Sequence, residues 1–116
     1  MLLTPVSAAD QMLESFFGQL LEWAGKPRWS GSGFTRLVVE LADLPGHPAR
    51  AIARRAKAVT ETWLAELLAK GRISKPSGRA REVMLLMEGA MVLMLIHDDR
   101  RYSEAALRAA KRLIRR

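Results

Sequence analysis

The most apolar stretch of the chain, residues 83–96, has the sequence VMLLMEGAMVLMLI. Twelve of its fourteen residues are apolar, and the exceptions are Glu88 and Gly89. Leu and Met favour helix, and no proline interrupts the stretch. A surface helix needs cover on one stripe only, whereas this stretch is apolar nearly all round. We therefore predict a central helix that packs on its own chain with one face and on a second copy of the protein with the other.

Apolar residues recur at three- and four-residue spacing in the rest of the chain, which is typical of amphipathic helices. The pattern predicts helices over residues 5–24, 34–44, 47–70, 79–97 and 100–114. Pro48 suits the first turn of the third helix, and Gly71 suits the position just after its end. Asp98 or Asp99 is expected to cap the fifth helix. The prediction is an all-α fold, an antiparallel bundle of about five helices that forms a single domain over residues 1–116.

Residue types that carry chemistry are sparse. The chain has no Cys, which excludes a disulfide framework, a thiol nucleophile and a Cys-ligated metal site. His47 and His97 are fifty residues apart without a ligand partner at metal spacing, so we interpret them as surface or capping residues. No nucleophile motif, phosphate loop or dinucleotide fingerprint is present. We therefore expect neither an enzyme nor a protein that needs a metal or cofactor.

Membrane association is not expected either. The N-terminal residues lack the basic region and the long apolar run of a signal peptide. The apolar stretch 83–96 is shorter than the roughly 20 residues that a bilayer crossing requires. These features, with the absence of Cys, favour a cytoplasmic protein.

Positive charge is concentrated in the second half of the chain. The net charge is +7, and residues 44–82 hold nine basic against three acidic residues. The basic run of the third helix contains Arg50, Arg54, Arg55 and Lys57, which could contact phosphates. Asn and Gln, which read base edges, are missing there. The run is interpreted as a solvated helix face; the alternative is a standalone basic helical protein that binds nucleic acid without sequence preference.

Two polar residues lie on otherwise apolar faces. Thr60 shares the core side of the third helix with Trp63, and Glu88 lies within the apolar fourth helix. A buried carboxylate is costly unless it is paired or hydrogen-bonded. Glu88 is therefore paired with an arginine, exposed at a seam, or directed at a polar ligand in a cavity, and the sequence leaves these alternatives open. Large flexible side chains near Trp63 and Met87 would suit an apolar ligand.

The order of segments resembles a known family. The closest parts are GFTRLVVELADLPGHPARAIARR (33–55), WLAELLAKGRI (63–73) and LLMEGAMVLMLIHDD (85–99). They resemble the C-terminal effector-binding and dimerization domain of TetR-family transcriptional regulators, and the resemblance covers nearly the whole chain. It implies that the chain is the ligand-sensing and dimerization module of a bacterial TetR-like regulator.

The resemblance implies two sites. The last two helices would pair with their twins in a four-helix homodimer interface, here formed by Leu86, Ala90, Leu93, Met94, Tyr102, Ala106, Ala109, Ala110 and Leu113. A small, largely apolar effector would bind among the earlier helices and the inner face of the penultimate one, in a pocket formed by Phe16, Phe17, Leu20, Phe34, Val38, Leu41, Val59, Thr60, Trp63, Met84, Glu88 and Met91.

The chain departs from the family at its beginning. Such regulators start with a helix-turn-helix that enters the major groove, and nothing here resembles it, because residues 1–24 already read as the first effector-domain helix. We therefore expect DNA to be a partner only through a helix-turn-helix that this chain lacks.

Overall fold

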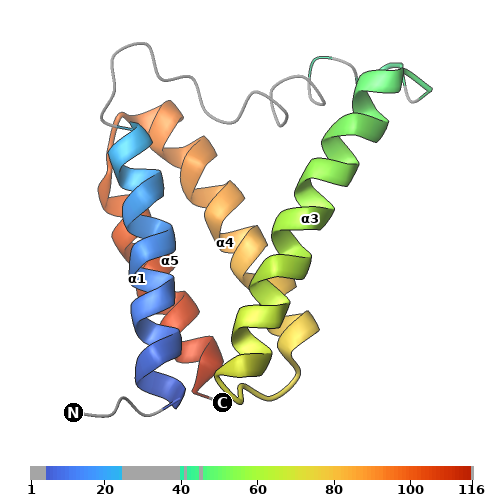
Figure 1. Cartoon of the computed structure of the whole chain (residues 1–116). Helices are drawn as coiled ribbons and strands as arrows, with labels where there is room; N and C mark the ends of the chain where they lie inside the picture. The colour runs from blue at the N-terminus through green and yellow to red at the C-terminus, as the bar shows by residue number, and fades with distance from the viewer. Residues whose placement is uncertain (1–4, 25–39, 41, 45, 116) are drawn as a thin grey trace.

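The computed structural model describes residues 5–24, 40, 42–44 and 46–115. These residues form four α-helices and contain no strand: α1 (Pro5–Ala24), α3 (Pro48–Lys70), α4 (Pro76–His97) and α5 (Arg101–Ile114) (Figure 1). The all-α prediction is confirmed for this part of the chain. The helix predicted over residues 34–44 falls mostly outside the described residues, so a fifth helix stays a prediction.

Three helix starts follow from local chemistry. The Nδ1 atom of His47 accepts the backbone N–H of Ala49 at 3.1 Å, which confirms His47 as the cap of α3. The N-cap position of α5 is Arg100, and Asp99 just before it accepts the N–H of Arg101 at 2.9 Å. The start of α4 was predicted too late, since the helix begins at Pro76 and not at residue 79. Proline suits the start of this helix because its φ is fixed near the helical value. It has no N–H, but N–H groups in the first turn have no acceptor within the helix.

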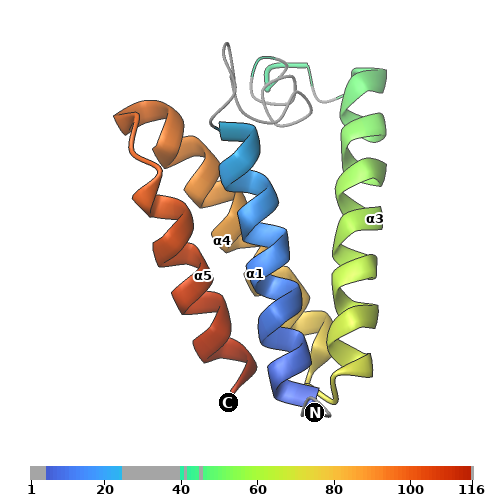
Figure 2. The same ribbon diagram turned by 60° about the vertical axis from the view of Figure 1, so that its left-hand side comes forward.

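The helices alternate in direction. α1 and α4 run one way, and α3 and α5 run the other way (Figure 1). α4 is the central helix of the described residues, because it packs extensively against both α3 and α5, while α1 packs mainly against α5. Figures 1 and 2 show that α3 meets the rest of the bundle near its C-terminal end and diverges from α1 toward its N-terminal end.

The core lies where α1, α3, α4 and α5 converge. Its largest fully buried side chains are Phe17, Leu13, Leu64, Leu68 and Val83. Burying each such side chain stabilises the fold by about 1.5–3 kcal/mol before conformational entropy is counted. The convergence of three helices on α4 explains why that helix needs apolar residues in so many directions.

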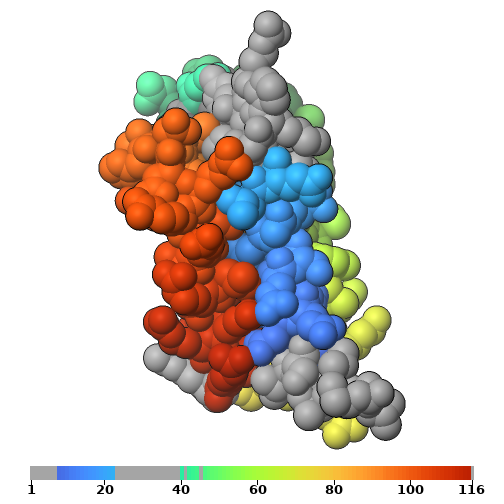
Figure 3. All heavy atoms as spheres, turned by 90° about the vertical axis from the view of Figure 1, so that its left-hand side faces the viewer, coloured from blue at the N-terminus to red at the C-terminus, as the bar shows by residue number. Residues whose placement is uncertain are grey.

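Polar contacts join α5 to α1, and Figure 3 shows the two helices side by side on one face of the molecule. The buried hydroxyl of Ser103 on α5 donates to the carbonyl oxygen of Phe17 on α1 at 3.3 Å. At the surface, Lys111 pairs with Glu14, and Arg115 pairs with Asp10 at 2.5 Å. These contacts fix which side of α5 faces the bundle and which side faces outward.

Candidate functional site

The outward face of α4 is apolar. Leu85, Val92 and Ile96 are 69%, 43% and 67% exposed, and their spacing with Gly89 places all four residues on one side of the helix. A Cβ atom added at Gly89 would meet no atom within 4 Å, so the backbone there is open to approach. We call these four residues the outer α4 stripe. Isolated exposed apolar residues are common, but a row of them marks an interaction surface.

This stripe continues onto the neighbouring flank of α5. The rings of His97 on α4 and Tyr102 on α5 stack with centroids 5.5 Å apart. Leu86 and Leu93 lie on the same side of α4 as His97, at helical spacing, and both are only partly covered. Ala109 and Leu113 follow Tyr102 along α5 at the same kind of spacing and are also partly exposed. The result is one apolar surface that spans both helices.

The structure places the residues predicted for the homodimer interface in two groups. Leu86, Leu93, Tyr102, Ala109 and Leu113 lie on the surface just described. The other four are buried in the chain's own core: Ala90, Met94, Ala106 and Ala110. The small alanines let α4 and α5 of one chain approach closely, so these positions are used within the subunit.

The outer α4 stripe was not predicted from the sequence, although its residues recur at helical spacing. Residues 85, 89, 92 and 96 follow the i, i+4, i+7, i+11 pattern inside the apolar stretch. Because that stretch is apolar all round, its periodicity does not tell which row faces outward. The packing of α3 and α5 on α4 decides it.

The structure places the residues predicted for the effector pocket in several different surroundings. Phe17, Leu20, Met84 and Met91 are buried in the core. Val59 is 69% exposed on α3. Phe34, Val38 and Leu41 lie outside the described residues. The remaining predicted residues gather at the seam between α1, α3 and α4: Phe16, Thr60, Trp63 and Glu88.

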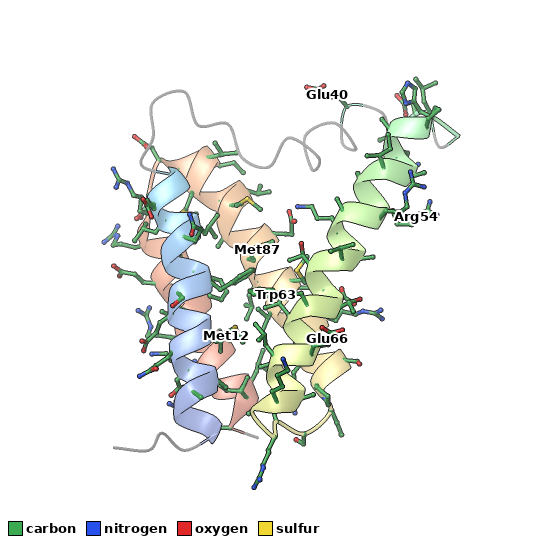
Figure 4. The ribbon with its side chains drawn as sticks, viewed as in Figure 1. Met12, Glu40, Arg54, Trp63, Glu66 and Met87 are labelled. Carbon is green, nitrogen blue, oxygen red and sulfur yellow. The ribbon has the colours of Figure 1, made fainter. Side chains whose placement is uncertain are left out.

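A cluster of aromatic and methionine side chains lies at this seam. The Phe16 ring is 5.5 Å from Phe17, edge to face, and 6.3 Å from Trp63, measured between centroids. Met12 and Met87 pack against the same core from α1 and α4, and Figure 4 shows both lying near Trp63 where the helices diverge. Trp63 remains 46% exposed. The seam therefore offers an adaptable apolar surface with partial access to solvent.

The polar residues of the seam are engaged within the chain. Glu88 pairs with Lys57 on α3 at 2.5 Å, with about a quarter of the Glu88 side chain exposed. The expected partner was an arginine, and the structure supplies a lysine from the basic run. The hydroxyl of Thr60 donates to the carbonyl of Ala56 one turn earlier, at 3.4 Å. The Lys57–Glu88 pair thus links α3 to α4 at the edge of the seam.

Trp63 also borders a shallow hollow of about 510 Å³ on the other side of α3. Its described lining residues come from one side of that helix: Arg55, Ala58, Val59, Thr62, Trp63 and Glu66. The volume lies in the range of small-molecule sites, although the hollow is open to solvent. Of these residues, only Val59 and Trp63 were predicted to belong to the effector pocket.

The basic run of α3 does not form one surface. Arg54 is exposed, Arg55 lines the hollow, and Lys57 is held by Glu88. Among the residues that the structure describes, no group of His, Asp or Glu has the arrangement of a metal site. None of the described helices has the length and apolar character that crossing a bilayer would take.

Comparison with known proteins finds two curated relatives, the HTH-type transcriptional regulators YjdC of Escherichia coli (strain K12) and of Shigella flexneri. Each is 26% identical to the chain over 115 residues, which are 99% of this chain and 60% of the regulator. The chain therefore spans about three-fifths of the length of the relatives it matches. No family model and no solved structure matches it. The chain is thus similar in sequence to transcriptional regulators over almost its whole length.

Proposed function

We propose that the chain is the effector-binding and dimerization module of a TetR-like transcriptional regulator that acts in the cytoplasm. The observation that carries the proposal is the sequence similarity to HTH-type transcriptional regulators, which extends over 99% of the chain. The all-α fold and the apolar surface on α4 and α5 are compatible with it. The family resemblance of segments 33–55, 63–73 and 85–99 adds the TetR assignment.

In this proposal the outer α4 stripe and the adjoining flank of α5 join two copies of the chain. The chemistry supports a second copy because an apolar row on a two-fold axis is complementary to itself. Gly89 would let the two α4 helices approach closely, as small residues do at helix crossings. The four-helix arrangement is retained, but its central residues are Leu85, Gly89, Val92 and Ile96.

The effector in this proposal is a small, largely apolar molecule that binds at the seam around Trp63. Phe16, Met12 and Met87 would contact its apolar body, since aromatic and thioether side chains adapt to varied shapes. Binding between α1 and α3 would favour one angle of α3 over another. Such a preference changes the population of the dimer arrangements and thereby the spacing of the DNA-reading domains of a full-length regulator.

A thermal-shift screen of apolar compounds tests the effector site. A compound that binds the native seam raises the unfolding midpoint, and at 100 times its Kd it stabilises by about 2.7 kcal/mol. Trp63→Ala should lose that shift, and Glu88→Gln should lose part of it. Leu85→Ala is the control on the side of α4 opposite Met87 and should keep the full shift.

The proposed effector site fails if no compound raises the midpoint, or if Leu85→Ala loses as much of the shift as Trp63→Ala. If Glu88→Gln lowers the midpoint but leaves the ligand-induced shift intact, the Lys57–Glu88 pair is structural. The dimer part of the proposal is tested separately, by the oligomeric state.

A further inference from the structure

The outward face of α5 carries a row of arginines. Arg101, Arg108, Arg112 and Arg115 are spaced by seven, four and three residues, so they lie on one side of the helix, opposite the buried Ala106 and Ala110. With a rise of 1.5 Å per residue, the row is about 21 Å long. We call it the α5 arginine row.

The two central arginines of this row form no ion pair. Arg101 pairs with Asp99 at 2.9 Å, and Arg115 pairs with Asp10. Within the described part of the chain, Arg108 and Arg112 make no ion pair, and both are exposed. The nearby α1 carboxylates of Asp10 and Glu14 are held by Arg115 and Lys111. The exposed Glu104 lies one turn before Arg108 and reduces the local charge without pairing, so the row keeps more positive than negative charge.

The shape of the row selects among anionic partners. A single small anion would need converging donors, whereas these guanidinium groups are strung along a line. A lipid surface would need apolar residues to insert beside the cations, but the partly exposed apolar residues of α5 lie on its flank toward α4 and not along the arginine row: Tyr102, Ala109 and Leu113. A duplex nucleic acid offers a linear series of phosphates, and arginine binds phosphate oxygens with two parallel hydrogen bonds.

We infer that the α5 arginine row binds the phosphate backbone of duplex DNA without regard to sequence. Such contacts position a protein on DNA and add affinity but carry no base information. The inference goes beyond the proposed function, in which DNA is reached only through a helix-turn-helix outside this chain. It is independent of the effector seam and of the apolar surface, because Arg108 and Arg112 belong to neither.

The chain contains its own matched control. Arg54 and Arg55 on α3 are also an exposed pair of arginines, but they point to different sides of their helix, and Arg55 lines the hollow beside Trp63. Replacing either pair with glutamine removes the same formal charge. Gln and Arg have similar helix propensities, so both helices should be preserved.

The experiment measures binding of the chain to a fluorescent DNA duplex of arbitrary sequence by anisotropy, over a series of salt concentrations. The logarithm of the affinity falls linearly with the logarithm of salt, with a slope of about −0.9 per phosphate contact. The double variant Arg108→Gln/Arg112→Gln should reduce the magnitude of the slope by about 2. Arg54→Gln/Arg55→Gln should keep the wild-type slope to within about 0.5.

Three results would overturn the inference: no binding by the wild type at low salt, an equal loss of slope in both double variants, or a larger loss in the α3 variant. Binding of the wild type to vesicles of anionic phospholipid in preference to the duplex would also overturn it. Circular dichroism of each variant verifies that the helices are intact, and a variant that has lost them is replaced by the single substitutions Arg108→Gln and Arg54→Gln.

Discussion

The outward faces of α4 and α5 are neighbours in the structure but opposite in character. α4 presents Leu85, Val92 and Ile96 around Gly89, whereas α5 presents a row of arginines. On their inward faces the two helices are alike, since both bury apolar residues such as Val83 and Ala110 in the core. The difference indicates that folding of one subunit satisfies α5 but leaves α4 with an apolar face to be covered.

The charge on α5 and the apolar character of α4 limit which faces of two copies can pack together. Two α5 arginine rows placed against each other would repel, because like charges across an interface cost several kcal/mol. Two outer α4 stripes would instead bury apolar area on both sides. The proposed dimer therefore uses α4 at its centre and only the Tyr102 flank of α5 at its edge.

The largest expected effect comes from placing a charge in the outer α4 stripe. Val92→Glu would bring two carboxylates together in a symmetric apolar interface, at a cost of several kcal/mol. The dissociation constant of the dimer should rise by about 1,000-fold, because each 1.4 kcal/mol changes it by a factor of ten. Sedimentation equilibrium measures it, and Arg108→Glu on α5 is the control that should leave the oligomeric state unchanged. Equal effects of both substitutions would remove the distinction between the two faces.

The next effect contrasts the two sides of α4 itself. Met94→Ala on the buried side should lower the free energy of unfolding by about 2–5 kcal/mol, because it removes core contacts and leaves a cavity. Leu85→Ala on the outer side should change the stability of the dissociated chain by less than about 0.5 kcal/mol. Urea unfolding at low protein concentration measures both. Similar losses for the two variants would mean that the outer stripe is covered within the subunit.

A smaller effect separates the two sides of α5. Ser103→Ala deletes the buried hydrogen bond to the carbonyl of Phe17 and should destabilise by about 0.5–1.5 kcal/mol, because that carbonyl keeps its hydrogen bond within α1. Arg112→Ala on the exposed side should lie within about 0.5 kcal/mol of wild type. Thermal unfolding of the two variants side by side measures the difference, and a greater loss for Arg112→Ala would contradict it.

The smallest effect concerns the turn between the two helices. Hydrogen bonds from the side chain and then from the backbone of Arg101 lower the pKa of Asp99 from 3.8 to about 2. A carboxyl with a lowered pKa stabilises the native state above its unfolded pKa, so this contribution is present above pH 3.8 and is lost as the pH falls toward 2. NMR titration should place the Asp99 midpoint near 2 in the wild type and between that value and 3.8 in Arg101→Ala, which removes the side-chain hydrogen bond but keeps the backbone one, with Arg108→Ala unchanged.

Much of the fold could be predicted from sequence because local chemistry determines the helix ends. Pro48 and Gly71 bound α3, and Asp99 accepts the first N–H of α5 from the position before the cap, Arg100. The start of α4 was predicted too late because Ser77 and Gly78, which follow Pro76, are typical of loops. The helix already begins at Pro76, whose φ is fixed near the helical value.

The candidate sites could be predicted only in part, because they depend on how helices meet. Trp63 and Phe16 were both placed at the effector site by the family resemblance, and they do lie together. Ala106 and Ala110 were assigned to the dimer interface, yet they are buried within the subunit, since small residues serve either kind of close contact equally well. Pairing with an arginine was one of three alternatives left open for Glu88, and its pairing with Lys57 depends on the crossing of α3 and α4.

In the proposed dimer the outer α4 stripe joins two copies of the chain, and a single introduced cysteine can detect this contact. The chain has no Cys of its own, so Gly89→Cys and Arg108→Cys each place one thiol on the outward face of α4 or of α5. A disulfide needs Cα atoms about 4.4–6.8 Å apart. If the outer α4 stripes meet, Gly89→Cys should form a covalent dimer under mild oxidation. Arg108→Cys should stay monomeric on a denaturing gel. Efficient crosslinking of Arg108→Cys with none in Gly89→Cys would contradict it.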